Sequence, residues 1–428
     1  MGRRTSSIAS LLFLIAAACG GGAADRATTI TLQVFADPAE AVAYRELIAA
    51  FEEDQDEIGV RLVPVGSQDD HMTKLSTAFS AGNPPDLFLL NYRRFGQFAD
   101  RDVLEPLGAR LERSSAVSAD DLYQEAVDAF VFDGALTCLP QNVSTPVVYY
   151  NSTLLRDAGL EPPAEDWTWD DLLDYAKAMT KDVNGDGTAE QHGLAFEPSL
   201  NRFAPFIWQA GGTIVDDVEN PTTMTLLEPA AIETLEFFSS LQYIHHVVPS
   251  VAEQESEDPE ARFAAGRLGM LIESRRATTA LREVPDLDWD VAPLPVHPER
   301  QERIVILHSD AYCMAKASKV KAAAFRFVEF ALGEKGSPIL ARTGRTVPSL
   351  RKVSESDAFL DPSQPPASAR VFLDQIPSVR RFPNVAAWNE IESRADPVIE
   401  EWFFGQEPPI NLGLEIDLAT LQVFRPGG

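Results

Sequence analysis

The segment Asp86-Leu87-Phe88-Leu89-Leu90 indicates the fold class, because its continuous apolar run is typical of a strand buried on both faces of a parallel sheet. Two further strands are predicted upstream, at residues 29–36 and 60–65, and an amphipathic helical pattern follows each of them. Strand, helix, strand, helix, strand is the order of an α/β layer fold with right-handed crossovers. In such sheets, ligands bind beyond the carboxyl ends of the strands.

The chain also contains three proline-marked segments that we interpret as crossings between two domains, at residues 140–146, 291–307 and 344–348. In the first of these, Pro140 and Pro146 would interrupt the ladder of a central strand, so short strands are predicted only at 136–139 and 147–150. The crossings predict a first lobe of residues 28–140 and 305–344, and a second lobe of residues 146–304 and 349–428.

Size and charge narrow the class of protein. The 428 residues are 45% hydrophobic, enough for a large core and two domains. Lys and Arg number 36 against 65 Asp and Glu, a formal net charge of −29. A surface this acidic repels nucleic acid and anionic membranes, so neither is an expected partner.

The N-terminus has the layout of an export signal. Arg3 and Arg4 precede an apolar run at 8–15, which is too short to span a membrane, and three alanines then lead into Cys19. This resembles the site at which bacterial lipoproteins are cleaved and acylated. We therefore expect a signal peptide at 1–18, a lipid-anchored tether at 19–28, and a location in the cell envelope. An ordinary cleaved signal peptide is the alternative.

Several short motifs occur in order from residue 82 toward the C-terminus. They are Gly82-Asn83-Pro84-Pro85-Asp86, Leu139-Pro140 ten residues before Tyr150-Asn151, Ala158-Gly159-Leu160 with Trp167-Thr168-Trp169-Asp170, Phe263-Ala264-Ala265-Gly266, and Pro293-Leu294-Pro295. Their order resembles that of the extracellular solute-binding proteins of family 1, the carbohydrate receptors of ATP-driven importers.

The resemblance implies a periplasmic-binding-protein fold of the α/β class, with two hinge-linked lobes and a ligand cleft between them. A ligand that contacts both lobes would favour the closed state over the open one. The family further implies a monomer that delivers a sugar or oligosaccharide to ABC permease subunits. It implies no cofactor and no catalysis.

Sugar hydroxyls are bound by planar polar side chains and carboxylates, and sugar faces by aromatic rings. The candidate ligand-binding residues are Asp37, Gln68, Asp69, Asn91, Tyr92 and Arg93 in the first lobe, Asn142 and Ser144 in the first crossing, and Trp208, Gly212, Glu273, Arg276 and Trp388 in the second lobe. Helix capping is the alternative role for the acidic residues after the first two strands, and core packing is the alternative for Trp208.

A neutral mono- or oligosaccharide is the leading ligand class. Compared with maltose-binding members of the family, Arg93 replaces an acid, Arg276 replaces a tryptophan and Ser144 replaces a carboxylate. Arginine binds carboxylate and phosphate in a bidentate way, so an anionic sugar is the alternative ligand. If the two arginines pair instead with neighbouring carboxylates such as Glu273, that alternative loses its support.

Apart from Cys19, the cysteines are Cys138 and Cys313. Two such thiols in an exported protein often pair, and the resemblance places Cys313 in a strand next to Cys138, near the hinge. We expect a disulfide between them, with two free buried thiols as the alternative.

Residues 182–190 place Asp182, Asn184, Asp186 and Glu190 at alternate positions, as in a calcium loop, but Gly193 stands where an EF-hand has its bidentate glutamate. We therefore predict no metal site there, and a calcium site completed by a distant carboxylate is the alternative. The chain also lacks H-E-x-x-H, G-x-S-x-G and G-x-x-x-x-G-K-[ST] motifs. A glycosidase with two carboxylates and a ligand-presenting sensor are the rival functions.

Overall fold

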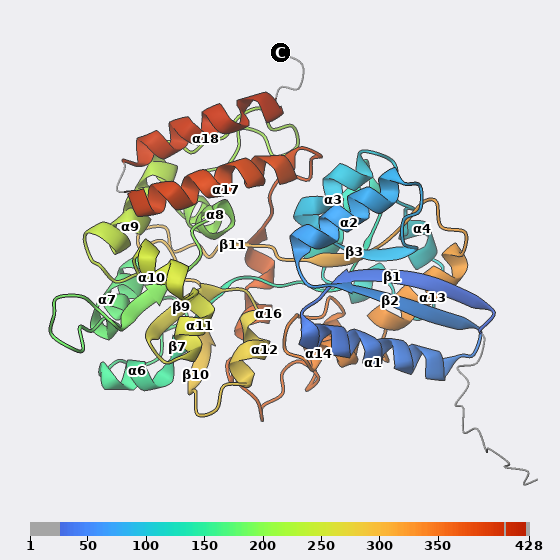
Figure 1. The fold of residues 1–428 in the computed structure, drawn as a ribbon, viewed down its shortest axis with the longest axis horizontal. Helices are drawn as coiled ribbons and strands as arrows, with labels where there is room; N and C mark the ends of the chain where they lie inside the picture. Colours follow the sequence, from blue (N-terminus) through green and yellow to red (C-terminus); the bar gives the residue numbers. More distant parts are fainter. Residues whose placement is uncertain (1–25, 406–407, 425–428) are drawn as a thin grey trace, which may run out of the picture.

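The computed structural model describes residues 26–405 and 408–424, which form two α/β lobes, each built around its own sheet (Figure 1). The sheet of the first lobe has the strand order β2(Ile58–Val65), β1(Thr28–Phe35), β3(Leu87–Asn91), β12(Asp310–Met314) and β6(Leu139–Pro140). β1 is parallel to β2 and β3, whereas β12 is antiparallel to β3 and β6. The predicted alternation of strands and helices is confirmed for this part of the chain.

The central strand of the first lobe, β3, is buried on both faces. Leu87, Phe88, Leu89 and Leu90 are at most 1% exposed. The helices of this lobe are α1(Pro38–Asp54), α2(Gln68–Ser80), α3(Tyr92–Ala99), α13(Lys321–Leu332) and α14(Ser337–Ala341). α1 begins with a proline and buries its apolar face, as expected for a helix that covers a sheet.

The second lobe contains the sheet order β10(Trp289–Ala292), β7(Val147–Asn151), β9(Leu268–Glu273) and β8(His192–Ala195). β7 is antiparallel to β10 and β9, and β8 is parallel to β9. Its helices are α6(Ser152–Asp157), α7(Trp169–Met179), α8(Leu200–Gln209), α9(Pro229–Tyr243), α10(Val251–Ser256), α11(Pro259–Ala264), α12(Ala277–Arg282), α17(Trp388–Gly405) and α18(Pro409–Phe424). Thr168 and Asp171 form a capping box that starts α7.

The strand predicted at 136–139 is wrong as a single element. β4(Val131–Phe132) and β5(Ala135–Leu136) form a small hairpin, and the chain then turns into β6. The hairpin turn is Asp133-Gly134, and both residues have positive φ, 47° and 76°. Two-residue turns of this kind favour Asp-Gly, and this one pairs β5 with β4, whereas β6 pairs with β12, so residues 136–139 are divided between two sheets.

The remaining short elements connect these parts. They are α4(Gly108–Leu111), α5(Gln124–Asp128), α15(Arg351–Ser354), α16(Val371–Asp374), β11(Val305–Ile306), β13(Val379–Arg380) and the 3-10 helices Ala119–Asp121 and Ile376–Ser378. β11 and β13 pair in parallel. No described helix is both long and apolar enough to cross a membrane.

Three crossing segments are hydrogen-bonded to one another between the lobes. The first crossing lies in the middle. On one side, Ser144 N–H donates to His308 O (2.7 Å) and His308 N–H donates to Ser144 O (2.8 Å). On the other side, Val143 N–H donates to Val347 O (2.9 Å). We call this group, residues 141–145, 307–309 and 345–349, the hinge ribbon.

The third crossing is held to both lobes. Arg345 pairs with Glu40 of α1, with its Nε 2.6 Å from the carboxylate. On the second lobe, Nε of the buried Arg275 donates to Gly344 O (2.7 Å), while its guanidinium lies over the rings of Phe359 and Phe372. Gly344 has φ of 76°, a conformation that favours glycine.

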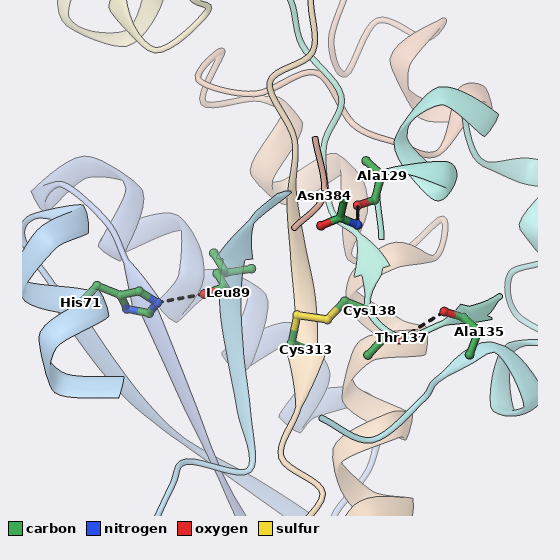
Figure 2. Close-up of a disulfide and its surroundings, with 8 residues drawn as sticks. All are labelled: His71, Leu89, Ala129, Ala135, Thr137, Cys138, Cys313 and Asn384. Carbon is green, nitrogen blue, oxygen red and sulfur yellow. Dashed lines mark hydrogen bonds between the residues drawn. A yellow bond between two sulfur atoms is a disulfide. The ribbon is translucent and has the colours of Figure 1, made fainter. Parts of the chain in front are cut away.

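Cys138 and Cys313 form a disulfide within the first lobe, with their Cα atoms 4.6 Å apart (Figure 2). Cys313 lies in β12 and Cys138 directly precedes β6, so the bond joins two neighbouring strands, as expected from the resemblance. Both residues are fully buried and 175 positions apart in the sequence. The bond therefore fixes an edge strand from the first half of the chain to a strand from the second half.

Candidate functional site

A cleft of about 580 Å³ lies between the lobes, against the hinge ribbon. The first lobe contributes residues at the carboxyl ends of β1 and β3 and at the start of α2, such as Phe35, Asn91 and Gln68. The second lobe contributes Glu273 at the end of β9 and Arg202 in the first turn of α8. This is the position at which α/β sheets bind ligands.

The cleft brings together many of the residues predicted from the sequence. Those that line it are Gln68, Asn91, Arg93, Asn142, Ser144, Glu273 and Arg276.

Three first-lobe candidates, Asp37, Asp69 and Tyr92, lie outside the lining of the cleft. Asp37 caps α1 by accepting from Glu40 N–H (2.8 Å) and pairs with Arg345 (2.9 Å). It therefore contacts Arg345, a lining residue, without lining the cleft itself. Asp69 is exposed in the first turn of α2. Tyr92 follows a fully buried strand and is itself 1% exposed.

The aromatic candidates of the second lobe are core residues. Trp388 is fully buried, with its ring centroid 4.8 Å from that of Phe382, and Trp208 packs against the same ring at 5.9 Å. Gly212 is buried where α8 meets α9, and a Cβ there would contact Ile207 and Ala230. The predicted stacking platforms are therefore wrong, because their rings fill the core.

We call the side of the cleft that the first lobe contributes the first wall. Amide groups and a carboxylate form one part of it. Asp310, at the start of β12, accepts from Asn91 Nδ2 (3.0 Å) and from Asn142 Nδ2 (3.1 Å). These bonds orient both amides at the point where the first lobe meets the hinge ribbon. Neither of these bonds is an ion pair.

Glu40 is the buried carboxylate of the same wall, 7% exposed. Burial raises the pKa of Glu40, Arg345 opposes this shift and the charges of Asp310 and Asp37 add to it, and together they bring the pKa to about 7. Its ionised and protonated forms are therefore both populated near neutral pH.

We call the side of the cleft that the second lobe contributes the second wall. Its buried carboxylate lies between two arginines. Glu273 is 4% exposed, and its carboxylate lies 2.5 Å from Arg202 Nη2 and 3.4 Å from Arg276 Nη2. Burial alone would raise the pKa of Glu273, but the two guanidinium groups hold it well below its usual range. Arg276 also pairs with Glu260 (2.8 Å).

Glu392 of α17 forms ion pairs with α3. Its carboxylate lies 2.6 Å from Arg93 Nη1 and 3.4 Å from Arg94 Nη1. One turn later, Asp396 accepts from the N–H of Leu200 at the start of α8 (2.9 Å). Burial, and then the charge of Glu392, raises the pKa of Asp396 to about 6.

His308 lies at the base of the cleft. Burial, together with the charges of Arg202 and Arg93, lowers the pKa of His308 to about 3, so the imidazole is neutral at physiological pH. Its Nε2 is 3.1 Å from Asn201 Nδ2. Phe35 and His308 are the aromatic side chains that the described part of the chain contributes to the lining.

Several lining residues escaped the sequence analysis. They are Glu40, Glu197, Asn201, Arg202, His308, Asp310, Arg345 and Asp396. Asn201 and Arg202 follow β8 through the Ser199 cap, so the rule that pointed to Asn91 after β3 could have found them. The second crossing is followed by His308 and Asp310, and the third contains Arg345. Polar residues in or beside a proline-marked crossing could therefore have been predicted to line the cleft.

The acidic loop at 182–190 is a surface turn. Oxygen atoms of Asp182, Asp186 and Glu190 lie within 4.8 Å of one another. Asp182 also accepts from the backbone N–H groups of Gly185 and Gly187 (2.6 and 2.8 Å). These bonds are those of a polar glycine turn.

Comparisons with known proteins agree with this architecture. The galactooligosaccharide-binding protein of Bacillus subtilis is 21% identical over 92% of the chain and 90% of its own length. The sn-glycerol-3-phosphate-binding protein UgpB of Escherichia coli is 27% identical, but over only 28% of each chain. The solved structure of the ABC substrate-binding protein Lmo0181 of Listeria monocytogenes, in complex with cycloalternan, superposes with a TM-score of 0.82. It is 27% identical and covers 92% of this chain and 98% of its own.

The model of the family described as bacterial extracellular solute-binding protein matches residues 36–338. These residues run from just after β1 into α14, and so they include the second sheet, every strand of the first sheet except β1, and most of the cleft. The two-lobed architecture, the cleft and this match lead to one conclusion: the chain belongs to the bacterial extracellular solute-binding proteins.

Proposed function

We propose that this chain is the substrate-binding component of an ABC importer, which binds a carbohydrate in the cleft and delivers it to a membrane permease. The cleft itself carries the proposal, since both lobes and the hinge ribbon line it with amides, carboxylates and arginines. These groups donate to and accept from sugar hydroxyls. The sugar ligands named for the Bacillus and Listeria proteins support a carbohydrate.

Ligand binding would bring the two walls together. Asn91 and Asp310 offer hydrogen bonds from the first lobe, and Arg202 and Glu273 from the second. A ligand that contacts both walls only when they are close lowers the free energy of the closed state more than that of the open state. The permease would then select the closed, loaded form.

We further propose that the chain is exported by a signal peptide at 1–18, anchored through a lipid on Cys19, and monomeric. Cys19 lies outside the described residues. The family supports export, and mass spectrometry of the membrane fraction tests the anchor. A diacylglyceryl group on Cys19 is expected, and unchanged localisation of a Cys19→Ser variant would contradict it.

A non-catalytic role fits the relatives, which are binding proteins. A sensor that presents its ligand to a membrane receptor uses the same cleft, so transport must be measured directly. Deletion of the gene should abolish uptake of the radiolabelled ligand and be reversed by the full-length chain. Unchanged uptake together with a lost transcriptional response would favour the sensor.

Ligand identity and site are tested together. A thermal-shift screen with neutral and acidic sugars should find a ligand, because binding to the folded state alone raises the unfolding temperature. Calorimetry with that ligand should show at least tenfold weaker binding to Asn142→Ala and to Asp310→Asn. The control Asp69→Asn removes an exposed charge outside the cleft, and equal losses in all three variants would contradict the assignment.

A further inference from the structure

Four polar atoms near the base of the cleft have no hydrogen-bond partner among the described residues. They are Ser144 Oγ, Asn201 Oδ1, and Nε and Nη1 of Arg202. The Ser144 and Arg202 side chains are only 6% exposed. A buried polar atom left without a partner destabilises a fold by roughly 1–3 kcal/mol, so such atoms are usually paired. Their clustering beside the cleft points to a ligand.

The three side chains lie around one residue, His308. Ser144 exchanges two backbone hydrogen bonds with His308, and Asn201 Nδ2 faces its Nε2. Arg202 follows Asn201 in α8 and pairs with Glu273, which lies opposite Val147 in the β7–β9 ladder. The unpartnered atoms therefore belong to a single place, where the hinge ribbon meets the first turn of α8.

We propose that Ser144, Asn201 and Arg202 form a subsite that binds two neighbouring hydroxyls of a neutral sugar, an inference that rests on the proposed function. Arg202 offers N–H donors, Asn201 Oδ1 accepts, and the Ser144 hydroxyl does either. A hydroxyl group both accepts and donates, so two of them satisfy this mixed set. A phosphate or carboxylate accepts from Arg202 and Ser144 but has no proton for Asn201 Oδ1.

The surrounding charges also favour a neutral ligand. Glu273 already neutralises the guanidinium of Arg202, at 2.5 Å. Asp396 and Glu197 also line the cleft, and Glu392 and Glu197 lie close enough to raise the pKa of Asp396, so an added anion at this end would meet carboxylates as well as the paired Arg93.

The two arginines that suggested an anionic sugar also have carboxylate partners. Arg93 shares Glu392 with Arg94 (2.6 and 3.4 Å), and Arg276 pairs with Glu260 (2.8 Å) and shares Glu273 with Arg202 (3.4 and 2.5 Å). The relatives include both oligosaccharide-binding and glycerol-phosphate-binding proteins, and these pairs place this cleft with the former.

Matched ligands test the inference on the full-length protein. Glucose, galactose and N-acetylglucosamine, and the disaccharides maltose and lactose, are compared with the 6-phosphates and uronates of the monosaccharides by thermal shift and calorimetry. We expect the best neutral sugar to bind at least tenfold more tightly than any anionic one. Tighter binding of an anionic sugar would overturn this subsite and leave the proposed function standing, whereas no shift with any sugar would overturn both.

Two serines of the hinge ribbon then separate binding from folding. Ser144→Ala removes an unpartnered hydroxyl, so we expect an unchanged or slightly higher unfolding temperature and about fivefold weaker binding of the best sugar. The control is Ser349→Ala, whose hydroxyl is fully buried and donates to Pro140 O. It should lower the unfolding temperature and leave affinity unchanged. The same behaviour in both variants would overturn the subsite.

Arg202→Lys keeps a positive charge opposite Glu273 but removes the guanidinium fork. We expect at least tenfold weaker binding of the best neutral sugar. Unchanged affinity in this variant would contradict a ligand-binding role for Arg202.

Discussion

The two walls of the cleft each bury a glutamate, and they treat it in opposite ways. Glu40 in the first wall has one arginine, Arg345, which is shared with another acid, and its pKa rises to about 7. Glu273 in the second wall lies between Arg202 and Arg276, and its pKa falls well below the usual range. Both side chains are less than a tenth exposed, so burial does not explain the difference.

The comparison shows that the ratio of cations to carboxylates decides the charge of a buried acid in this cleft. Glu273, between its two arginines, stays ionised at every physiological pH. Glu40 changes its charge with pH, and the best-oriented groups of the first wall are the amides that Asp310 holds. Glu273 and its arginines are therefore the better candidate for a constant recognition surface.

Removal of the disulfide should have the largest effect and should sharpen the difference between the lobes. It joins two strands of the first lobe across 175 positions of chain, and no strand of the second sheet contains a cysteine. For a loop of this length, chain-entropy arguments predict a loss of about 4–5 kcal/mol in the free energy of unfolding for Cys138→Ala/Cys313→Ala. Urea denaturation measures the loss. Hydrogen exchange should accelerate in β6 and β12 more than in β7 and β9, and equal acceleration would contradict a local effect.

Breaking the ion pairs should separate the two walls next. Arg202→Met leaves Glu273 buried with only the more distant Arg276, and we expect a loss of about 3–5 kcal/mol in unfolding free energy at pH 6. Arg345→Met should lose less than about 2 kcal/mol, because Glu40 can take up a proton. Chemical denaturation of both variants at one pH is the measurement. Equal losses would mean that the walls do not differ as described.

A third effect concerns the dependence of stability on pH. Because the pKa of folded Glu40 lies above its ordinary value of 4.5, the folded state binds this proton more tightly than the unfolded state. The stabilisation is complete below pH 4.5 and is lost as pH rises through about 7, a change of about 3 kcal/mol. Glu40→Gln should remove this part of the pH dependence, measured as the difference from the wild type between pH 4.5 and 8.

Glu273→Gln should change the pH dependence of stability in the opposite direction. The lowered pKa of Glu273 gives a stabilisation that is present above pH 4.5 and is lost as pH falls further. If both variants changed the pH dependence in the same direction, the contrast between the walls would be wrong.

The sequence predicted the fold well wherever local chemistry and tertiary structure agree. The apolar run at 87–90 lies in β3, and Pro140 and Pro146 flank the central segment of the hinge ribbon. The Asp133-Gly134 hairpin was not predicted, although Asp-Gly is a strong hairpin signal, and the strand predicted at 136–139 joined β5 of that hairpin to β6 of the first sheet.

The site was predicted where it follows the strands and missed where distant segments meet. Asn91 directly follows β3, so sequence position alone placed it. Arg345 pairs with Glu40 across 305 positions, and no local pattern reports such a contact. The prediction for Trp388 was wrong for a related reason, because the role of this side chain depends on Phe382 and the core around it rather than on its residue type.

The hinge ribbon has a mechanical consequence. Three antiparallel segments joined edge to edge by backbone hydrogen bonds resist being pulled apart sideways, yet such a ribbon twists and flexes out of its plane with little change in bond length. The lobes can therefore rotate about the hinge ribbon. Ser144 and His308 lie within the hinge ribbon, so we expect the base of the cleft to keep its shape while the walls above it open and close.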